Sequence, residues 1–123
     1  MKILEIAFST YPVTDMARAR AFYEGVLGLT PTMDHDLGEG GHWVEYDIGT
    51  GTLGLGRYPG WSPTKDGCTV GLEVEDFEEA VGHLKSAGTP VTMGPMETPV
   101  CHMIMVSDPD GNPLCIHKRK ANH

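Results

Sequence analysis

Apolar side chains recur at helical spacing in two stretches of the chain, residues 13–28 and residues 74–88. In each stretch an apolar side chain returns every three or four positions, the pattern of a helix that buries one face. These positions are Ala19, Phe22, Tyr23 and Val26 in the first stretch, and Phe77, Ala80, Val81 and Leu84 in the second. The pattern predicts one amphipathic helix in each stretch.

The ends of both predicted helices carry the same signals. Each stretch opens with V-x-D, and the carboxylate of Asp15 or Asp76 suits an N-cap that accepts a hydrogen bond from an unpaired N–H of the first turn. Each stretch ends at a glycine, Gly28 or Gly88, the residue type that most often terminates a helix. We therefore expect Asp15 and Asp76 to be helix N-caps.

The two helices belong to a longer internal repeat. The V-x-D motifs begin at Val13 and Val74, 61 positions apart. The segments HWVEYDIGTG and HMIMVSDPDG begin at His42 and His102, 60 positions apart. A near-constant offset across two elements predicts that the chain contains the same structural unit twice.

Segments typical of β-strands surround both helices. ILEIAFSTY and CTVGLEV precede them, and a short strand, a longer strand, a tight turn and a last strand follow. In the turns GTG and DPDG, Gly51 and Gly111 are expected to supply the positive φ angle. The sequence therefore predicts an α+β fold of two repeated β-α-β-β-β (βαβββ) modules, at about 1–57 and 68–120, with a connection at about 58–67.

Composition and charge limit the classes of partner. The 123 residues, 40% apolar and 21% charged, are typical of a single globular domain over 1–123. A net charge of −8 repels phosphate backbones and anionic lipids, so we expect neither nucleic acid nor a membrane as a partner. The sequence has no signal-peptide core and no run of about 18 apolar residues, which predicts a cytoplasmic protein.

The repeat resembles a known superfamily. A duplicated βαβββ unit with V-x-D before the first helix, FYEGVLGL at its end and DPDGN before the last strand is similar to the vicinal oxygen chelate (VOC) superfamily. That superfamily includes glyoxalases, bleomycin-resistance proteins and extradiol dioxygenases. The resemblance implies that each module curls into a half-barrel, that the two modules enclose a cavity, and that the protein is a homodimer.

The resemblance also implies where a metal would bind. Metal-using members place His, Gln or Glu at equivalent positions on the first and last strands of their modules, and the repeat locates those positions at Phe8, Leu55, Thr69 and Cys115. Only Cys115 has a side chain that binds a divalent metal, whereas a catalytic site usually takes at least three protein ligands. We therefore expect no metal cofactor, and we expect Cys115 to form part of the cavity wall.

Strand alternation selects further candidates for the cavity. Val44, Tyr46, Ile104 and Val106 are expected to face the helices, so their neighbours face the other way. The residues predicted to line the cavity, together with the four positions above, are Trp43, Glu45, Glu73, Met103, Met105 and His117. A tryptophan and two methionines form an adaptable apolar wall for a flat or irregular organic ligand. The alternative is that these side chains pack a small core.

Two details of this set have alternative interpretations. Glu45 is the expected polar handle for a ligand. Glu73 either receives a cationic or hydroxyl-bearing ligand, acts as a base whose pKa is raised by burial, or is a solvated rim carboxylate. Tyr58 and Trp61 in the connection either close over the cavity as a lid or fix the loop to the surface.

Two main functions remain open at this stage, beside a third interpretation as a partner-regulating module whose cavity is vestigial. The first is metal-free binding of a small organic molecule, as in bleomycin-resistance proteins. The alternative is a lyase, isomerase or dioxygenase that uses a divalent metal ion at displaced ligands such as Glu73, His102 and His117. The residues at the four equivalent positions favour the first function.

Overall fold

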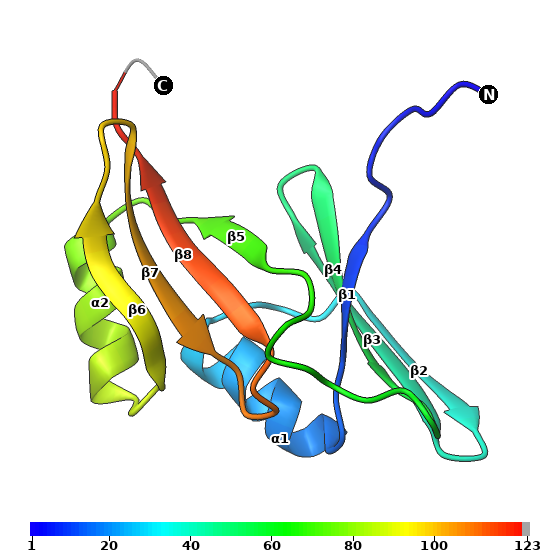
Figure 1. The fold of residues 1–123 in the computed structure, drawn as a ribbon. Coiled ribbons are helices and arrows are strands. Elements are labelled where there is room, and N and C mark those ends of the chain that lie inside the picture. The colour runs from blue at the N-terminus through cyan, green and yellow to red at the C-terminus, as the bar shows by residue number, and fades with distance from the viewer. Residues whose placement is uncertain (122–123) are drawn as a thin grey trace. The chain divides into compact units, whose positions relative to one another are not determined.

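The computed structural model describes residues 1–121. The chain divides into two compact units, Met1–Pro63 and Thr64–His123, and the boundary lies inside the connection predicted at 58–67. Each unit contains one four-stranded sheet and one helical segment. The elements of each unit can be followed by their labels in Figure 1. The predicted α+β fold with two repeated βαβββ modules is confirmed.

The first unit contains strands β1 (Ser9–Pro12), β2 (Met33–Gly38), β3 (Gly41–Ile48) and β4 (Gly51–Arg57). Helix α1 (Met16–Arg20) follows β1 and continues as a π-helical segment, η1 (Ala21–Val26). The sheet order is β1-β4-β3-β2, with β1 parallel to β4 and the other pairs antiparallel. The crossover through α1 and η1 therefore places one helical segment against one face of the sheet.

The second unit repeats this arrangement. It contains β5 (Val70–Glu73), α2 (Phe77–Ser86), β6 (Val91–Glu97), β7 (Cys101–Ser107) and β8 (Pro113–Arg119). The sheet order is β5-β8-β7-β6, and β5 is parallel to β8.

Both helices begin and end as their local sequences predict. Oδ1 of Asp15 accepts a hydrogen bond of 3.0 Å from the backbone N–H of Arg18, and Oδ1 of Asp76 accepts one of 3.0 Å from Glu79. Gly28 and Gly88 have φ angles of 75° and 72°. The N-cap predictions are confirmed.

One turn prediction is wrong. Gly111 has the expected positive φ of 84°, but in the first hairpin the left-handed residue is Gly49, with φ of 58°, and Gly51 begins β4. The reason is the loop length: Ile48 pairs with Gly51, so only two residues connect the strands, and a turn of this length needs a positive φ at its first position.

The loops make the two repeats differ by one residue. Asp108 is hydrogen-bonded to Asn112 across the second turn, so three residues lie between this pair, whereas two lie between the paired residues Ile48 and Gly51 of the first turn. Ser9 pairs with Leu53 in the first unit, and the equivalent residue Val70 pairs with Leu114 in the second. Leu53 and Leu114 are therefore equivalent, 61 positions apart. The offset between repeats is 60 in β3 and β7, and it becomes 61 in β4 and β8.

Each sheet buries one face against its own helical segment. The side chains on this face include the four residues predicted to face the helices, each 0% exposed. The buried set is Tyr11, Val44, Tyr46, Leu53 and Leu55 in the first unit and Ile104, Val106, Leu114 and Ile116 in the second. Burying each large apolar side chain contributes roughly 1.5–3 kcal/mol before entropy is subtracted. We call the opposite side of each sheet its open face.

The first strand is shorter than predicted. The sequence indicates a strand from about residue 3 to residue 11, but β1 covers only Ser9–Pro12. Pairing with β4 begins at Leu53, opposite Ser9. Ile3, Leu4 and Ile6 in the preceding segment are 80%, 80% and 83% exposed.

Candidate functional site

Trp43 lies on the open face of the first unit, as alternation with the buried Val44 predicts. Its indole packs against β4 where that strand has glycines. A Cβ atom at Gly54 would lie 2.8 Å from Cζ2 of Trp43, and one at Gly56 would lie 2.4 Å from Cζ3 of Trp61. Because real Cβ atoms do not approach carbon atoms so closely, glycine at these positions permits the rings to lie against the strand.

Four aromatic rings form a continuous row beside these glycines. The ring centroids of Phe8 and Trp43 are 5.7 Å apart, those of Trp43 and Tyr58 are 6.4 Å apart, and those of Tyr58 and Trp61 are 5.7 Å apart. We call Phe8, Trp43, Tyr58 and Trp61 the aromatic strip. Its geometry supports the interpretation that Tyr58 and Trp61 fix the connection to the sheet.

Glu45 fixes the indole of Trp43 within the aromatic strip. The indole Nε1–H of Trp43 donates a hydrogen bond of 2.6 Å to Oε2 of Glu45. This bond satisfies the polar atom of the indole, and it places a carboxylate next to an apolar surface. The role of Glu45 as a polar handle for a ligand stays a prediction.

The open face of the second unit carries sulfur-containing side chains. Met105 pairs with Cys115, and Met103 pairs with His117, across the β7–β8 ladder. Cys115 is buried, and burial raises the pKa of its thiol. A neutral, buried thiol acts as a small apolar side chain. The role of Cys115 as a cavity-wall residue stays a prediction.

Glu73 and His117 lie side by side at one end of this face. Nδ1 of His117 is 2.6 Å from Oε1 of Glu73, and the backbone N–H of Arg119 donates a hydrogen bond of 2.6 Å to Oε2 of the same carboxylate. The Arg119 N–H, followed by His117, lowers the pKa of Glu73. The expectation of a raised pKa for Glu73 is therefore wrong, because both carboxylate oxygens accept hydrogen bonds.

Leu55 is not placed as predicted, whereas the cavity role of Thr69 stays a prediction. Thr69 lies just before β5 and is exposed. Leu55 is 0% exposed and pairs with the buried residues Tyr11 and Val44, so it belongs to the helix-facing core. The longer second loop explains the error: the structural equivalent of Cys115 is Gly54, and that of Leu55 is Ile116. Leu55 is thus corrected from cavity wall to core.

The proposed displaced metal ligands do not come together. Glu73 and His117 lie on the open face, whereas His102 lies on the helix-facing side, with its imidazole centroid 5.6 Å from the ring of Phe77. Within residues 1–121, no group of three or more His, Cys, Asp or Glu side chains is arranged to hold a metal ion. The ligand set of Glu73, His102 and His117 is therefore wrong. The positions inherited from the metal-using pattern do not fit a metal either, since Phe8 and Gly54 have no donor atom.

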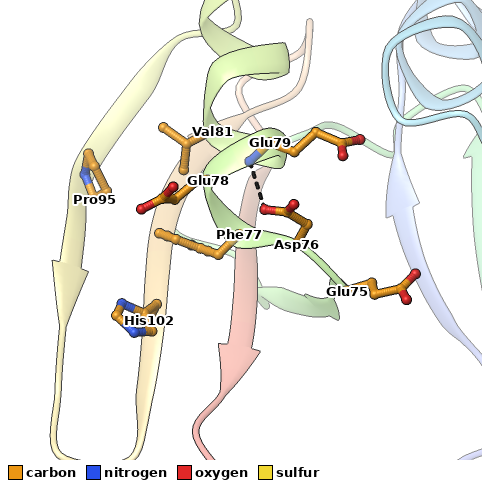
Figure 2. Close-up of a pocket in the computed structure, with 8 residues that line it drawn as sticks. All are labelled: Glu75, Asp76, Phe77, Glu78, Glu79, Val81, Pro95 and His102. Atoms are coloured by element: carbon orange, nitrogen blue, oxygen red, sulfur yellow. Dashed lines mark hydrogen bonds between the residues drawn. The ribbon is translucent and has the colours of Figure 1, made fainter.

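A hollow near the start of α2 was not predicted. It has a volume of about 790 Å³ and lies between the first turns of α2 and the strands β6 and β7. Figure 2 shows Pro95 and His102 opposite Phe77, Glu78 and Val81. The only signal for it in the sequence is the acidic run EVEDFEE. Most of its polar atoms are carboxylates that flank a helix N-terminus, where negative charge is stabilising in itself.

The helix-facing side of the first unit holds a network of charged side chains. Arg20 contacts Glu24 at 2.5 Å and Asp34 at 2.6 Å, and Nε2 of His42 lies 2.6 Å from Oδ1 of Asp34. The Tyr46 hydroxyl donates a hydrogen bond of 2.8 Å to Glu24. Hydrogen bonding from Arg20 lowers the pKa of Glu24, and burial followed by this carboxylate raises the pKa of Tyr46.

This network accounts for the repeated histidines. His42 takes part in it, and its equivalent His102 lies 3.9 Å from Glu97 in the second unit. Each histidine therefore has an acidic neighbour within its own unit.

No helix among residues 1–121 is long and apolar enough to cross a membrane.

Solved structures with the same architecture cover almost the whole chain. TnmS3, an antibiotic binding protein from Streptomyces sp. CB03234, is 26% identical, with a TM-score of 0.78 over 98% of this chain and 99% of that chain. A superfamily member from Sphaerobacter thermophilus DSM 20745 is 25% identical, with a TM-score of 0.75 over 94% of this chain and 98% of that chain. A glyoxylase/bleomycin resistance protein/dioxygenase domain from Frankia sp. EAN1pec has a TM-score of 0.81 at 16% identity, over 99% and 96% of the two chains.

The sequence comparison with family models agrees with the structural one. No curated protein sequence matches the chain. The model of the Glyoxalase/Bleomycin resistance protein/Dioxygenase superfamily matches residues 3–116. This match includes both repeats and the motifs that define them. The chain therefore belongs to the glyoxalase/bleomycin resistance protein/dioxygenase superfamily, the VOC superfamily that its repeated motifs resemble.

Proposed function

We propose that this protein binds a small organic molecule on the open face of its first sheet, where the aromatic strip makes the main contact. The observation that carries the proposal is the placement of Trp43 and Trp61 against Gly54 and Gly56. Side chains at these two positions of β4 would displace the rings. The glycines thus maintain a row of aromatic surface that a planar ligand can stack on.

The polar groups on this face narrow the ligand class. Oε2 of Glu45 accepts a hydrogen bond from the indole N–H of Trp43, so the carboxylate lies beside the ring. A cation held next to a tryptophan and a carboxylate gains both cation–π and Coulomb attraction. The net charge of −8 acts in the same direction over longer range. We infer a preference for planar, positively charged molecules.

We also propose that binding requires no resident metal. The supporting argument is the chemistry of the side chains: the open face of the second unit offers a neutral thiol at Cys115 and thioethers at Met103 and Met105. These groups suit contact with an organic molecule. TnmS3 is described as an antibiotic binding protein, and its 26% identity with this chain supports a binding role.

The protein is further proposed to act as a cytoplasmic homodimer. The exposed segment before β1 supports association, because Ile3, Leu4 and Ile6 place apolar surface in water next to an edge strand. We expect light scattering coupled to size-exclusion chromatography to give twice the chain mass. The double variant Ile3→Ser/Ile6→Ser is expected to shift the mass toward that of one chain. A wild-type protein that is monomeric at high concentration contradicts the proposal.

The test of binding uses isothermal titration calorimetry with 9-aminoacridine, a planar cation, and with 1-pyrenesulfonate, a planar anion. Loss of a stacking contact costs roughly 1–3 kcal/mol, so Trp43→Leu is expected to weaken binding of the cation by about fivefold or more. Glu45→Gln is expected to reduce the preference for the cation over the anion.

The matched control is Glu78→Gln, which removes one charge from the hollow beside α2. It is expected to leave the affinity unchanged. If Glu78→Gln weakens binding and Trp43→Leu binds normally, the binding site lies in that hollow and the role of the aromatic strip is contradicted. Failure of the wild-type protein to bind either probe contradicts the proposed ligand class.

A further inference from the structure

The contact between Glu73 and His117 is a second polar feature of the open faces, and it is separate from the aromatic strip. The two side chains come from adjacent positions on β5 and β8, because Glu73 pairs with His117 in the parallel ladder. Both oxygens of the carboxylate accept hydrogen bonds of 2.6 Å, one from His117 and one from the backbone of Arg119. The backbone bond fixes the carboxylate, and the carboxylate in turn fixes the imidazole.

The geometry determines which imidazole nitrogen carries a proton. An ionised carboxylate only accepts hydrogen bonds, so Nδ1 of His117 must donate to Glu73. In the neutral ring this arrangement leaves the lone pair on Nε2. Among the residues that the structure describes, Nε2 of His117 has no hydrogen-bond partner. A preoriented acceptor is therefore left for a group from outside the chain.

Space for such a group is present. A hollow of about 240 Å³ is lined by Gly71, Glu73, His117 and Arg119. A Cβ atom at Gly71 would meet no atom within 4 Å, so this position leaves the floor of the hollow open. The side chain of His117 is 28% exposed and that of Glu73 is 38% exposed. The pair is accessible without being fully solvated.

We propose that Glu73 and His117 form a carboxylate–imidazole pair that binds an ionisable hydroxyl group, phenolic or enolic, of an organic molecule in this hollow of the second unit. This inference goes beyond the proposed function, because the aromatic strip belongs to the first unit. The ligand O–H donates to Nε2 of His117. When the hydroxyl is acidic enough, its O–H bond breaks, the proton passes to Nε2, and the electron pair stays on oxygen.

The charges in the hollow favour that transfer. The product is an imidazolium beside the Glu73 carboxylate, and the ligand oxyanion lies in a hollow that Arg119 also lines. The negative charge formed on the ligand thus has two cationic neighbours, while the carboxylate offsets the charge of the imidazolium. Cys115, two positions before His117, stays neutral because burial raises its pKa.

The first experiment compares 4-nitrophenol with its methyl ether, 4-nitroanisole, at a mildly acidic pH where free 4-nitrophenol is protonated. We expect the wild-type protein to bind the phenol at least fivefold more tightly than the ether, and to produce the long-wavelength absorbance of the phenolate. His117→Gln and Glu73→Gln are expected to remove both effects. Urea unfolding of each variant shows that its fold is retained.

The outcomes separate this inference from the proposed function. Equal affinity for the phenol and the ether, with no phenolate absorbance, overturns the role of the pair while binding to the aromatic strip stands. Trp43→Leu, which changes only the aromatic strip, is expected to leave the ratio of the two affinities unchanged. A change in that ratio caused by Trp43→Leu alone assigns the hydroxyl preference to the strip and overturns the inference.

The second experiment needs no ligand. Long-range ¹H–¹⁵N correlation spectra report which imidazole nitrogen of His117 is protonated. We expect the Nδ1–H tautomer in the neutral wild-type protein and a mixture of tautomers in Glu73→Gln. A neutral His117 protonated on Nε2 in the wild-type protein overturns the inference.

Discussion

The indole of Trp43 contacts β4 at Gly54 so closely that a methyl group on that glycine would lie 2.8 Å from Cζ2 of the ring. The same glycine is the structural equivalent of Cys115 in the second unit, since β4 and β8 are related by 61 positions. The two open faces thus differ at equivalent positions. Gly54 has no side chain and is covered by the indole of Trp43, whereas Cys115 has a buried thiol.

This contact leads to a prediction about stability. Gly54→Ala is expected to displace the indole and to lower the free energy of unfolding by about 1–3 kcal/mol, the usual cost of overpacking. Urea unfolding followed by tryptophan fluorescence measures both effects. Gly71→Ala is the control, because a Cβ atom there meets open space, and its stability is expected to equal or slightly exceed that of the wild-type protein. Equal stability of the wild-type protein and Gly54→Ala contradicts the observed packing.

The two N-caps allow a paired test of the repeat. Asp15→Ala and Asp76→Ala each remove a carboxylate that accepts a 3.0 Å hydrogen bond from the first helical turn. Each substitution is expected to cost about 1 kcal/mol, measured by urea unfolding. Glu75→Ala, one residue before the second cap, is expected to change the stability by less than about 0.5 kcal/mol. A loss for Glu75→Ala as large as that for Asp76→Ala is inconsistent with specific capping.

Acid is expected to destabilise the protein. Hydrogen bonds lower the pKa of Glu24, Asp34, Glu73 and Glu97 from ordinary values of 4.5 for Glu and 3.8 for Asp. A carboxyl group with a lowered pKa contributes stability above its unfolded-state pKa, and this is lost as the pH falls through the folded-state value. The urea midpoint is therefore expected to decrease steadily below about pH 4.5.

Glu24→Gln tests the source of this pH dependence, because Arg20 and Tyr46 both hydrogen-bond to the Glu24 carboxylate. The variant is expected to be less stable at neutral pH and to lose less stability on acidification. A pH profile parallel to that of the wild-type protein would assign the effect to other carboxylates.

The three cysteines are expected to differ in reactivity. Cys68 is exposed, whereas Cys101 and Cys115 are buried. Because the thiolate is the reactive form, the raised pKa of Cys115 slows its modification further. A thiol-disulfide reagent such as Ellman's reagent is expected to modify one thiol rapidly in the folded protein and the other two only in denaturant. Cys68→Ser should remove the fast phase, and a persistent fast phase in this variant contradicts the assignment.

Much of the candidate site follows from strand alternation alone. The strands alternate between completely buried residues on the helix-facing side and residues on the open face, as the pattern predicts. The residues on the open face are Trp43, Glu45, Met103 and Met105. The row formed by Phe8, Tyr58 and Trp61 with Trp43 was not predicted, because it depends on loop residues and on glycines that have no side chain to signal their role. The functional assignment of these residues stays a prediction that the binding experiments test.

The sequence by itself determined the duplicated fold, the helix caps and the superfamily, because these features depend on local periodicity and on motifs whose residues are close together in the chain. Tertiary structure alone decided which residues share a face across strands. A loop one residue longer moved the equivalent of Cys115 from Leu55 to Gly54, and parallel pairing brought Glu73 to within 2.6 Å of His117 across 44 positions. Such contacts depend on strand register, which is set by loop length and by the packing of a whole sheet against its helix.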